Sequence, residues 1–110
     1  MAVPRFLQPY LASYDISKMS PKEDKKIIVT QILNTGDTQA TRWLFRNYSL
    51  EEIKEAIRHP LRGMWFPQSL SYWKKVFNVK ISSPAYKLAL SIFEPRPELY
   101  KKFFLNKGNV

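Results

Sequence analysis

The feature that most constrains the fold is a series of helix-start and helix-stop signals, which divides the middle of the chain into short segments. Ser20 is followed by Pro21 and, three places on, by Glu23, so a hydroxyl and a carboxylate can cap each other's free amides. Gly36 then ends the segment, because glycine is typical of helix C-termini. The apolar residues between these signals fall three or four apart, as on one face of a helix: Ile28, Val29, Ile32 and Leu33. The pattern predicts a first helix that begins after Ser20 and ends at Gly36.

Two more helices are predicted to follow with almost no linker between them. Asp37 or Thr38 can cap the second helix, over about residues 39–48. Ser49 and Glu52 have the spacing of another capping box, which starts the third helix. Pro60 ends that helix, since proline disfavours helical geometry at the residue before it. The residues predicted to face inward are Ala40, Trp43, Leu44 and Tyr48 on the second helix, and Leu50, Ile53, Ala56 and Ile57 on the third.

The C-terminal half continues the helical pattern. Residues 61–66 hold a glycine and several large apolar side chains, and are predicted to form a packed loop. Apolar spacing predicts a fourth helix over residues 67–77, and Ser83 with Pro84 opens a fifth that runs to about Phe93. The residues predicted to face inward are Leu70, Trp73, Val76 and Phe77 on the fourth helix, and Leu88, Ala89 and Ile92 on the fifth.

These segments predict an all-α protein, a compact single-domain bundle of five to six short helices. The 110 residues match the usual size of one domain, and 45% of them are apolar, which is enough for a core without metals or disulfides. Residues 1–19 are predicted to form an ordered arm across the bundle, and residues 20–93 the helical core. Residues 94–110 are a basic, aromatic C-terminal helix or tail, which can pack either on the core or on a partner.

Several kinds of site lack the residues that they need. There is no cysteine, and His59 is the single histidine, so we expect no metal site and no disulfide. The three glycines are scattered singly, which excludes a phosphate-binding glycine loop, and we expect no cofactor. The N-terminus has no long apolar segment like that of a signal peptide, and no apolar run approaches the roughly 18 residues of a membrane span. We therefore expect a cytoplasmic protein that does not associate with membranes.

The acidic residues of the third predicted helix were considered as a catalytic site. Glu52 is explained by capping, and Glu51 and Glu55 lie opposite the apolar stripe beside basic residues, as on a solvated helix face. His59 follows at the helix end, but no motif supplies it with a nucleophile or an orienting acid. We therefore predict no catalytic residues, and a protein that is not an enzyme.

Charge is distributed unevenly along the chain. The first 55 residues carry eight basic and seven acidic side chains, whereas the remainder carries ten basic and two acidic ones, and no carboxylate lies between Glu55 and Glu94. Such a basic half favours anionic partners, either an acidic protein surface or a phosphate backbone. The residues predicted to bind a partner or nucleic acid are Arg58, Arg62, Tyr72, Lys74, Lys75, Lys80, Lys87, Lys101 and Lys102.

Nucleic-acid binding remains open as an alternative. Tyr72 lies beside Lys74 and Lys75, and aromatic side chains between lysines can stack on bases while the ammonium groups meet phosphates. The abutting second and third helices resemble a helix-turn-helix in spacing, but the outward face of the third has balanced charges. Arg42 and Arg46 lie four apart and repel each other slightly, and a solvated face is the simplest interpretation of them.

The stretch Arg42-Trp43-Leu44-Phe45-Arg46-Asn47-Tyr48 resembles a motif in a family of small prokaryotic proteins. Members of that family share a proline-rich aromatic N-terminal stretch ending in Tyr-Asp, then a helix, a glycine turn, a Trp-Arg-Trp-Leu stretch and a Pro-x-x-x-x-x-Trp segment. The corresponding parts here are Pro9-Tyr10, Tyr14-Asp15-Ile16, Thr35-Gly36-Asp37 and the segment from Pro67 to Trp73. The resemblance covers about residues 7–77 and departs at Thr41, where the family usually has its first tryptophan.

The resemblance implies an antitoxin-like companion of nucleotidyltransferase-type toxins of the abortive-infection class. The leading hypothesis is therefore a non-enzymatic interaction protein with an acidic protein partner, such as a toxin of that type. The alternative is a basic nucleic-acid-binding protein, such as a transcriptional regulator.

Overall fold

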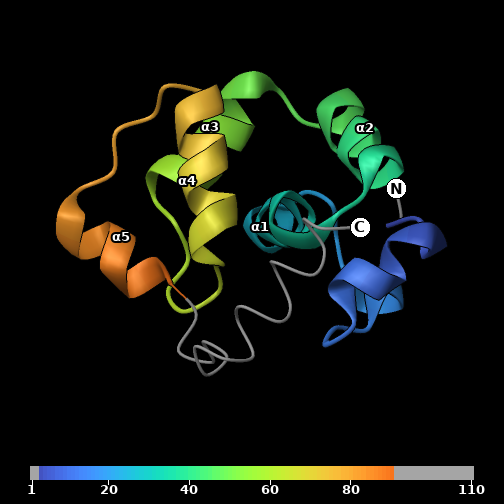
Figure 1. Ribbon diagram of the computed structural model, residues 1–110. Coiled ribbons are helices and arrows are strands. Elements are labelled where there is room, and N and C mark those ends of the chain that lie inside the picture. Colours follow the sequence, from blue (N-terminus) through green and yellow to red (C-terminus); the bar gives the residue numbers. More distant parts are fainter. Residues whose placement is uncertain (1–2, 91–110) are drawn as a thin grey trace, which may run out of the picture.

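The computed structural model describes residues 3–90, which form five α-helices and two 3₁₀-helices (Figure 1). In chain order the elements are η1 (Arg5–Leu11), η2 (Ile16–Lys18), α1 (Lys25–Thr35), α2 (Thr38–Asn47), α3 (Leu50–Arg58), α4 (Pro67–Val76) and α5 (Ser83–Ala89). The predicted all-α fold is confirmed, and the β-type pairing in this range is one isolated parallel bridge between Trp65 and Leu90. No helix within residues 3–90 has the length and apolar character needed to cross a bilayer.

Helix α1 lies at the centre of the bundle. It is seen end-on in Figure 1 and contacts η1, α2, α3 and α4 around it. A helix that is enclosed on several sides needs apolar residues around most of its circumference. The buried residues of α1 meet that need: Ile28, Val29, Ile32 and Leu33, together with Thr30. The hydroxyl of Thr30 donates to the carbonyl of Lys26 at 2.6 Å, so its burial leaves no unpaired polar atom.

Hydrogen bonds to polar groups near the end of α1 fix the position of α4. The side-chain amide of Asn34 donates to the carbonyl of Met64 at 3.0 Å, and its Oδ1 accepts from the N–H of Phe66 at 2.9 Å. The indole N–H of Trp73, on α4 itself, donates to the carbonyl of Leu33 at 2.7 Å. The C-terminal carbonyls of a helix lack partners within it, so the bond from Trp73 satisfies one of them, and the three bonds together hold α4 against α1.

The loop between α3 and α4 is packed, as predicted. Trp65 lies in this loop and is fully buried. Its backbone N–H donates to the carbonyl of Ala89, and the N–H of Gly63 donates to the carbonyl of Leu88, both at 2.9 Å. Gly63 has a φ of 69°, a left-handed conformation that favours glycine. The loop thereby holds the C-terminal end of α5 against the bundle.

The N-terminal residues form the ordered arm that the sequence predicts. The arm places four apolar side chains in the core, namely Val3, Leu7, Leu11 and Ile16. The side-chain amide of Gln8 bridges the carbonyls of Leu11 and Tyr14 at 3.0 Å each, and so closes the turn between η1 and η2. The arm is therefore part of the core.

Two of the predicted helix caps are confirmed. The carboxylate of Asp37 accepts from the N–H of Ala40 at 2.8 Å, which caps α2. Ser49 and Glu52 form a reciprocal capping box at the start of α3. Because α1, α2 and α3 are short, such caps contribute appreciably to their stability.

The capping box predicted at Ser20 is wrong in one partner. The Ser20 hydroxyl does accept from the N–H of Glu23 at 3.2 Å, but Asp24 instead of Glu23 accepts from the Ser20 N–H, at 2.8 Å. Residues 21–24 form a turn, and α1 begins at Lys25. The acid one place further on closes this turn, so the helix starts later than predicted.

Several residues predicted to face inward do not. Leu50, Val76 and Leu88 are exposed. On α4, Val76 lies one turn from the exposed Tyr72, whereas the buried stripe passes through Leu70. On α5, Ala89 is buried, and its neighbour Leu88 points to solvent. Leu50, Val76 and Leu88 therefore lie at the edge of the buried faces, because each helix buries fewer residues than its apolar pattern predicts.

Trp43 was also predicted to lie in the core, but it is only half-buried. The buried positions of α2 are Ala40 and Leu44, one turn apart, and Trp43 lies at their edge. Its ring packs edge-on to Tyr48, with 5.9 Å between the ring centroids.

Leu50 is exposed because it is the first residue of α3, before the first buried position of that helix.

Helix α5 ends at Ala89 and does not reach Phe93 as predicted. Leu90 takes an extended conformation and forms the bridge with Trp65, so pairing with the loop replaces a further helical turn. The predictions for Ile92, for the segment 94–110 and for the binding residues Lys101 and Lys102 lie outside the described residues.

A tight turn between α1 and α2 depends on Gly36. A Cβ atom at this position would lie 2.5 Å from the carbonyl oxygen of Ile32, which accepts a hydrogen bond from the Gly36 N–H at 2.7 Å. We expect Gly36→Ala to lower the free energy of unfolding by about 1–3 kcal/mol, because backbone atoms must move to admit the methyl group. Thermal unfolding measures this loss. Gln39→Ala, at an exposed position of α2, is the control, and equal melting temperatures for the two variants would contradict the prediction.

Candidate interaction surfaces

Four of the predicted binding residues come together over α4 and the segment that follows it. Two adjoining hollows share Ser71, Lys75 and Tyr86, and no Asp or Glu of the described chain lines either of them. We use the name α4–α5 surface for the side chains that give these hollows their character: Tyr72, Lys74, Lys75, Lys80 and Tyr86. The surface is therefore basic and aromatic, with no acid of its own.

The turn after α4 explains why the lysines gather. The chain reverses at Asn78, whose φ of 51° is a left-handed conformation that asparagine adopts more readily than most residues. The N–H of Val79 donates to the carbonyl of Lys74 at 3.0 Å, and the Val79 side chain is buried. These contacts hold Lys80 beside the last turn of α4, next to Lys75.

Tyr86 completes the surface, although the sequence analysis gave it no role. The ammonium group of Lys74 lies 5.9 Å from the centroid of its ring, at the distance of a cation–π contact. Its hydroxyl donates to the carbonyl of Pro67 at 3.5 Å, which links α5 to the start of α4. The only sign of Tyr86 in the sequence is an aromatic residue beside Lys87, and that sign is not specific.

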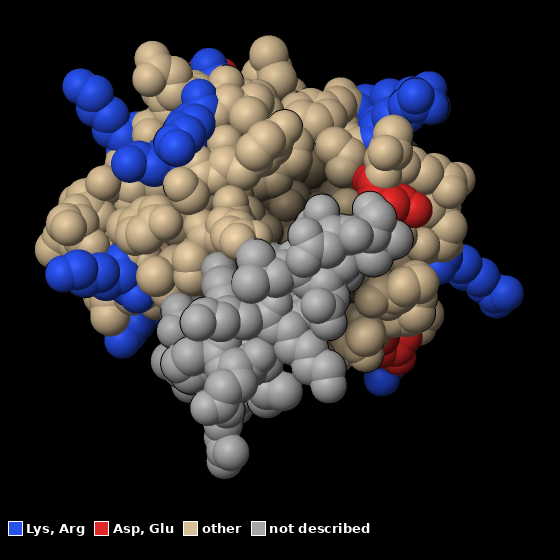
Figure 2. Space-filling view, in the orientation of Figure 1, with Lys and Arg blue, Asp and Glu red and all other residues tan. Residues whose placement is uncertain are grey.

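The remaining predicted residues do not line these hollows. Arg58 is on α3 and forms an ion pair with Glu55, which offsets its charge. Arg62 and Lys87 are exposed elsewhere, on the loop and on α5. Figure 2 shows Lys and Arg side chains both on the side where α4 and α5 lie and on the opposite side, whereas the larger acidic groups in this view lie only on the opposite side.

A cluster of aromatic side chains joins α2 to α4. Trp73 stacks on Phe77 with 5.7 Å between ring centroids, and Phe45 contacts Trp73 at 6.3 Å and Phe77 at 6.0 Å. Tyr72 packs edge-on to Trp73 at 5.0 Å. Phe45 and Tyr72 are 38% and 58% exposed, so the cluster is part of the surface and not only of the core. The apolar stripe of α2 does not include Phe45, so the sequence pattern did not predict a role for this residue.

Another hollow lies against this aromatic cluster, on its α2 side. We call it the α2–α4 hollow, and the side chains that matter in it are Arg42, Phe45, Arg46 and Trp73. Neither arginine forms an ion pair with any residue in the range 3–90. The carboxylate of Asp37 also borders the hollow, but the N–H of Ala40 and the hydroxyl of Tyr10 bind it, and they lower the pKa of Asp37.

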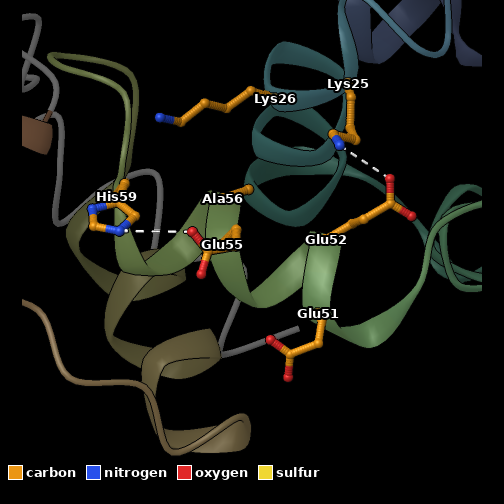
Figure 3. A pocket seen from close by; sticks show the side chains of 7 residues that line it. All are labelled: Lys25, Lys26, Glu51, Glu52, Glu55, Ala56 and His59. Atoms are coloured by element: carbon orange, nitrogen blue, oxygen red, sulfur yellow. Dashed lines mark hydrogen bonds and ion pairs between the residues drawn. The ribbon is translucent and has the colours of Figure 1, made fainter.

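A separate hollow is lined mainly by charged groups of α1 and α3 (Figure 3). Lys25 forms an ion pair with Glu52 at 3.1 Å, and His59 Nε2 lies 3.6 Å from a carboxylate oxygen of Glu55. Glu51 points away from both pairs. The capping N–H of Ser49 and the ammonium group of Lys25 lower the pKa of Glu52. The Glu52 and Glu55 carboxylates of this hollow therefore each have a basic partner.

No group of three or more Asp, Glu or His in the described part of the chain could hold a metal ion.

Burial, together with the nearby Glu52 and Asp24 carboxylates, raises the pKa of Tyr48 to about 12. The Tyr48 hydroxyl donates to the carbonyl of Pro21 at 2.6 Å. Tyr48 is thus a structural link between α2 and the turn before α1. The α4–α5 surface and the α2–α4 hollow, whose cations form no ion pair with any residue in the range 3–90, are the surfaces best suited to bind another molecule.

Residues 8–57 match the model of a family of unknown function, DUF6922. The match covers the arm from residue 8 onward, α1, α2 and nearly all of α3, and it leaves out α4 and α5. No curated protein and no solved structure matches the chain. Arg42, Phe45 and Arg46 lie inside the matched segment, whereas the α4–α5 surface lies outside it.

Proposed function

We propose that this protein is a non-enzymatic binding protein that uses the α4–α5 surface to engage an acidic surface on a partner protein. The observation that supports this proposal is a set of lysines around the exposed Tyr72 and the partly buried Tyr86, with no carboxylate of the described chain lining the hollows between them. Aromatic residues that anchor in a partner's groove supply binding energy, and complementary charge accelerates association and selects the partner.

The resemblance in the sequence gives this partner a class. We propose a nucleotidyltransferase-type toxin, with the present protein as its antitoxin-like companion. The α4–α5 surface would then meet acidic residues at the rim of a groove on the toxin. A nucleotidyltransferase-like reading frame next to this gene is the natural candidate for the partner.

The experiment is a binding titration of that toxin with the purified protein and two charge-reversal variants. Lys75→Glu with Lys80→Glu places acids in the α4–α5 surface, whereas Lys18→Glu with Lys22→Glu makes the same change at exposed positions in the N-terminal part. We expect the first variant to weaken binding roughly 100-fold, because like charges then face each other across the interface. The second should bind within a few-fold of the unchanged protein. Equal losses in both variants, or no binding by any of them, would contradict the proposal.

A nucleic acid is the second candidate partner of the same surface. Tyr72 is 58% exposed beside Lys75, an arrangement that allows a base to stack while a phosphate meets the ammonium group. Phosphate binding releases counterions, so affinity for nucleic acid should fall at least tenfold between about 50 and 200 mM salt. Titrations of mixed-sequence DNA and RNA at both concentrations measure this slope. No binding at the lower concentration would eliminate this candidate.

A further inference from the structure

The α2–α4 hollow contains features that the proposed protein interface does not use. It lies at α2, its two cations come from that helix, and its aromatic floor comes from both α2 and α4. Like charges one turn apart on a helix destabilise it slightly, and here no acid within residues 3–90 pairs with either of them. Two arginines without an acidic partner in this range, beside the exposed ring of Phe45 and the partly buried ring of Trp73, favour an anionic occupant with flat, apolar parts.

We propose that the α2–α4 hollow is a binding site for single-stranded nucleic acid. Arg42 and Arg46 contact neighbouring phosphates, since residues four apart present their side chains on the same face of a helix. Phe45 offers its exposed ring to a base, next to Trp73. The hollow is open and lies on the surface, which suits an extended strand whose bases are free to stack. This site is separate from the proposed protein interface and does not depend on it.

The chemistry of the hollow favours a single strand over a duplex. A duplex hides the faces of its bases within the stack and offers only groove edges and phosphates, so Phe45 and Trp73 would gain nothing from it. The borders of the hollow include Thr38 and Thr41, small hydroxyl residues that leave room for a strand. Asp37 repels phosphate at one end, so we place the phosphates toward Arg42 and Arg46 and away from the α2 cap.

The test uses fluorescence anisotropy with labelled oligothymidylate and oligouridylate of roughly ten nucleotides, at about 50 and 200 mM salt. Four forms of the full chain are compared after their melting curves have shown that each is folded. They are the unchanged protein, Arg42→Gln with Arg46→Gln, Phe45→Leu, and the control Lys18→Gln with Lys22→Gln. A fifth form, Lys75→Gln with Lys80→Gln, removes the same charge from the α4–α5 surface.

We expect the unchanged protein to bind both oligonucleotides and to bind a hairpin duplex at least tenfold more weakly. Removal of the two arginines should weaken binding at least tenfold and lower the salt slope by about 1.4, the value for two phosphate contacts on a single strand. Phe45→Leu keeps an apolar side chain but removes the ring, and it should weaken binding about tenfold with the salt slope unchanged. The Lys18 and Lys22 control should bind almost as the unchanged protein does.

Four results would overturn this proposal. The first is no binding of either oligonucleotide at about 50 mM salt. The second is an equal loss in the arginine variant and in the Lys18 and Lys22 control, which would show a response to net charge alone. The third is a loss confined to the Lys75 and Lys80 variant, which would place nucleic acid on the α4–α5 surface. An arginine variant that loses the partner toxin but keeps the oligonucleotides would assign the hollow to the protein interface, and would also contradict the proposal.

Discussion

Trp65→Ala should lower the free energy of unfolding by about 3–5 kcal/mol. Trp65 is the largest of the fully buried side chains, so its truncation leaves a cavity that the surrounding helices cannot fill. A domain of this size typically has about 5–15 kcal/mol of stability, and the variant should therefore be close to unfolding at room temperature. Trp65 also holds α5 through its backbone pairing with Ala89, so unfolding of the loop should release α5 as well.

Chemical unfolding of Trp65→Ala measures this loss of stability. Two other variants serve as comparisons that show whether the loss comes from the cavity. Trp65→Phe keeps most of the volume and removes an indole N–H that has no hydrogen-bond partner in the described structure, so it should cost much less. Trp43→Ala should also cost less, because Trp43 is only half-buried and solvent already reaches it. A larger loss for Trp43→Ala than for Trp65→Ala would contradict the assignment of Trp65 to the core and of Trp43 to its edge.

Leu7→Ala should lower the free energy of unfolding by about 2–5 kcal/mol. Leu7 lies in the N-terminal arm and is fully buried, and η1, the element that carries it, contacts the central helix α1. An arm that only rested on the surface would lose far less stability on the same substitution. Phe6→Ala, at an exposed neighbour in the same element, is the control and should stay within about 0.5 kcal/mol of the unchanged protein. Equal unfolding midpoints for the two variants would contradict the assignment of the arm to the core.

Short-range signals predicted the fold well. The caps at Asp37 and Ser49 and the stop before Pro60 place α2 and α3 nearly at their observed bounds, because each depends on atoms within a few residues. The end of α5 depends instead on a distant partner, since Leu90 pairs with Trp65, and no local signal announces that contact. Long-range pairing of this kind is what a sequence pattern cannot locate.

The difference between local signals and long-range contacts also holds for the interaction surfaces. The sequence predicted that Lys74, Lys75 and Lys80 belong to a basic surface, and their charge alone was sufficient for that prediction. It did not predict that Tyr86 joins them, because the turn at Asn78 and the position of α5 decide that contact. The sequence also did not predict the aromatic cluster around Phe45, because that cluster depends on how α2 packs against α4.

The apolar pattern of α2 predicted its inward-facing side chains, of which Ala40 and Leu44 are buried as expected and Trp43 is only half-buried. Phe45 contacts α4 instead, a helix that lies more than twenty residues further along the chain. Aromatic residues outside a core stripe therefore need the packing of helices to be known before a role can be given to them.

The most direct test of the central proposal is amide hydrogen exchange of this protein, free and bound to the nucleotidyltransferase-type toxin that we propose as its partner. If the α4–α5 surface is the interface, peptides from residues 67–89 should exchange more slowly in the complex, and Lys75→Glu with Lys80→Glu should abolish that protection. Peptides from the hollow between α1 and α3 should exchange at the same rate in both states. Protection confined to residues 25–59, with none in residues 67–89, would contradict the account.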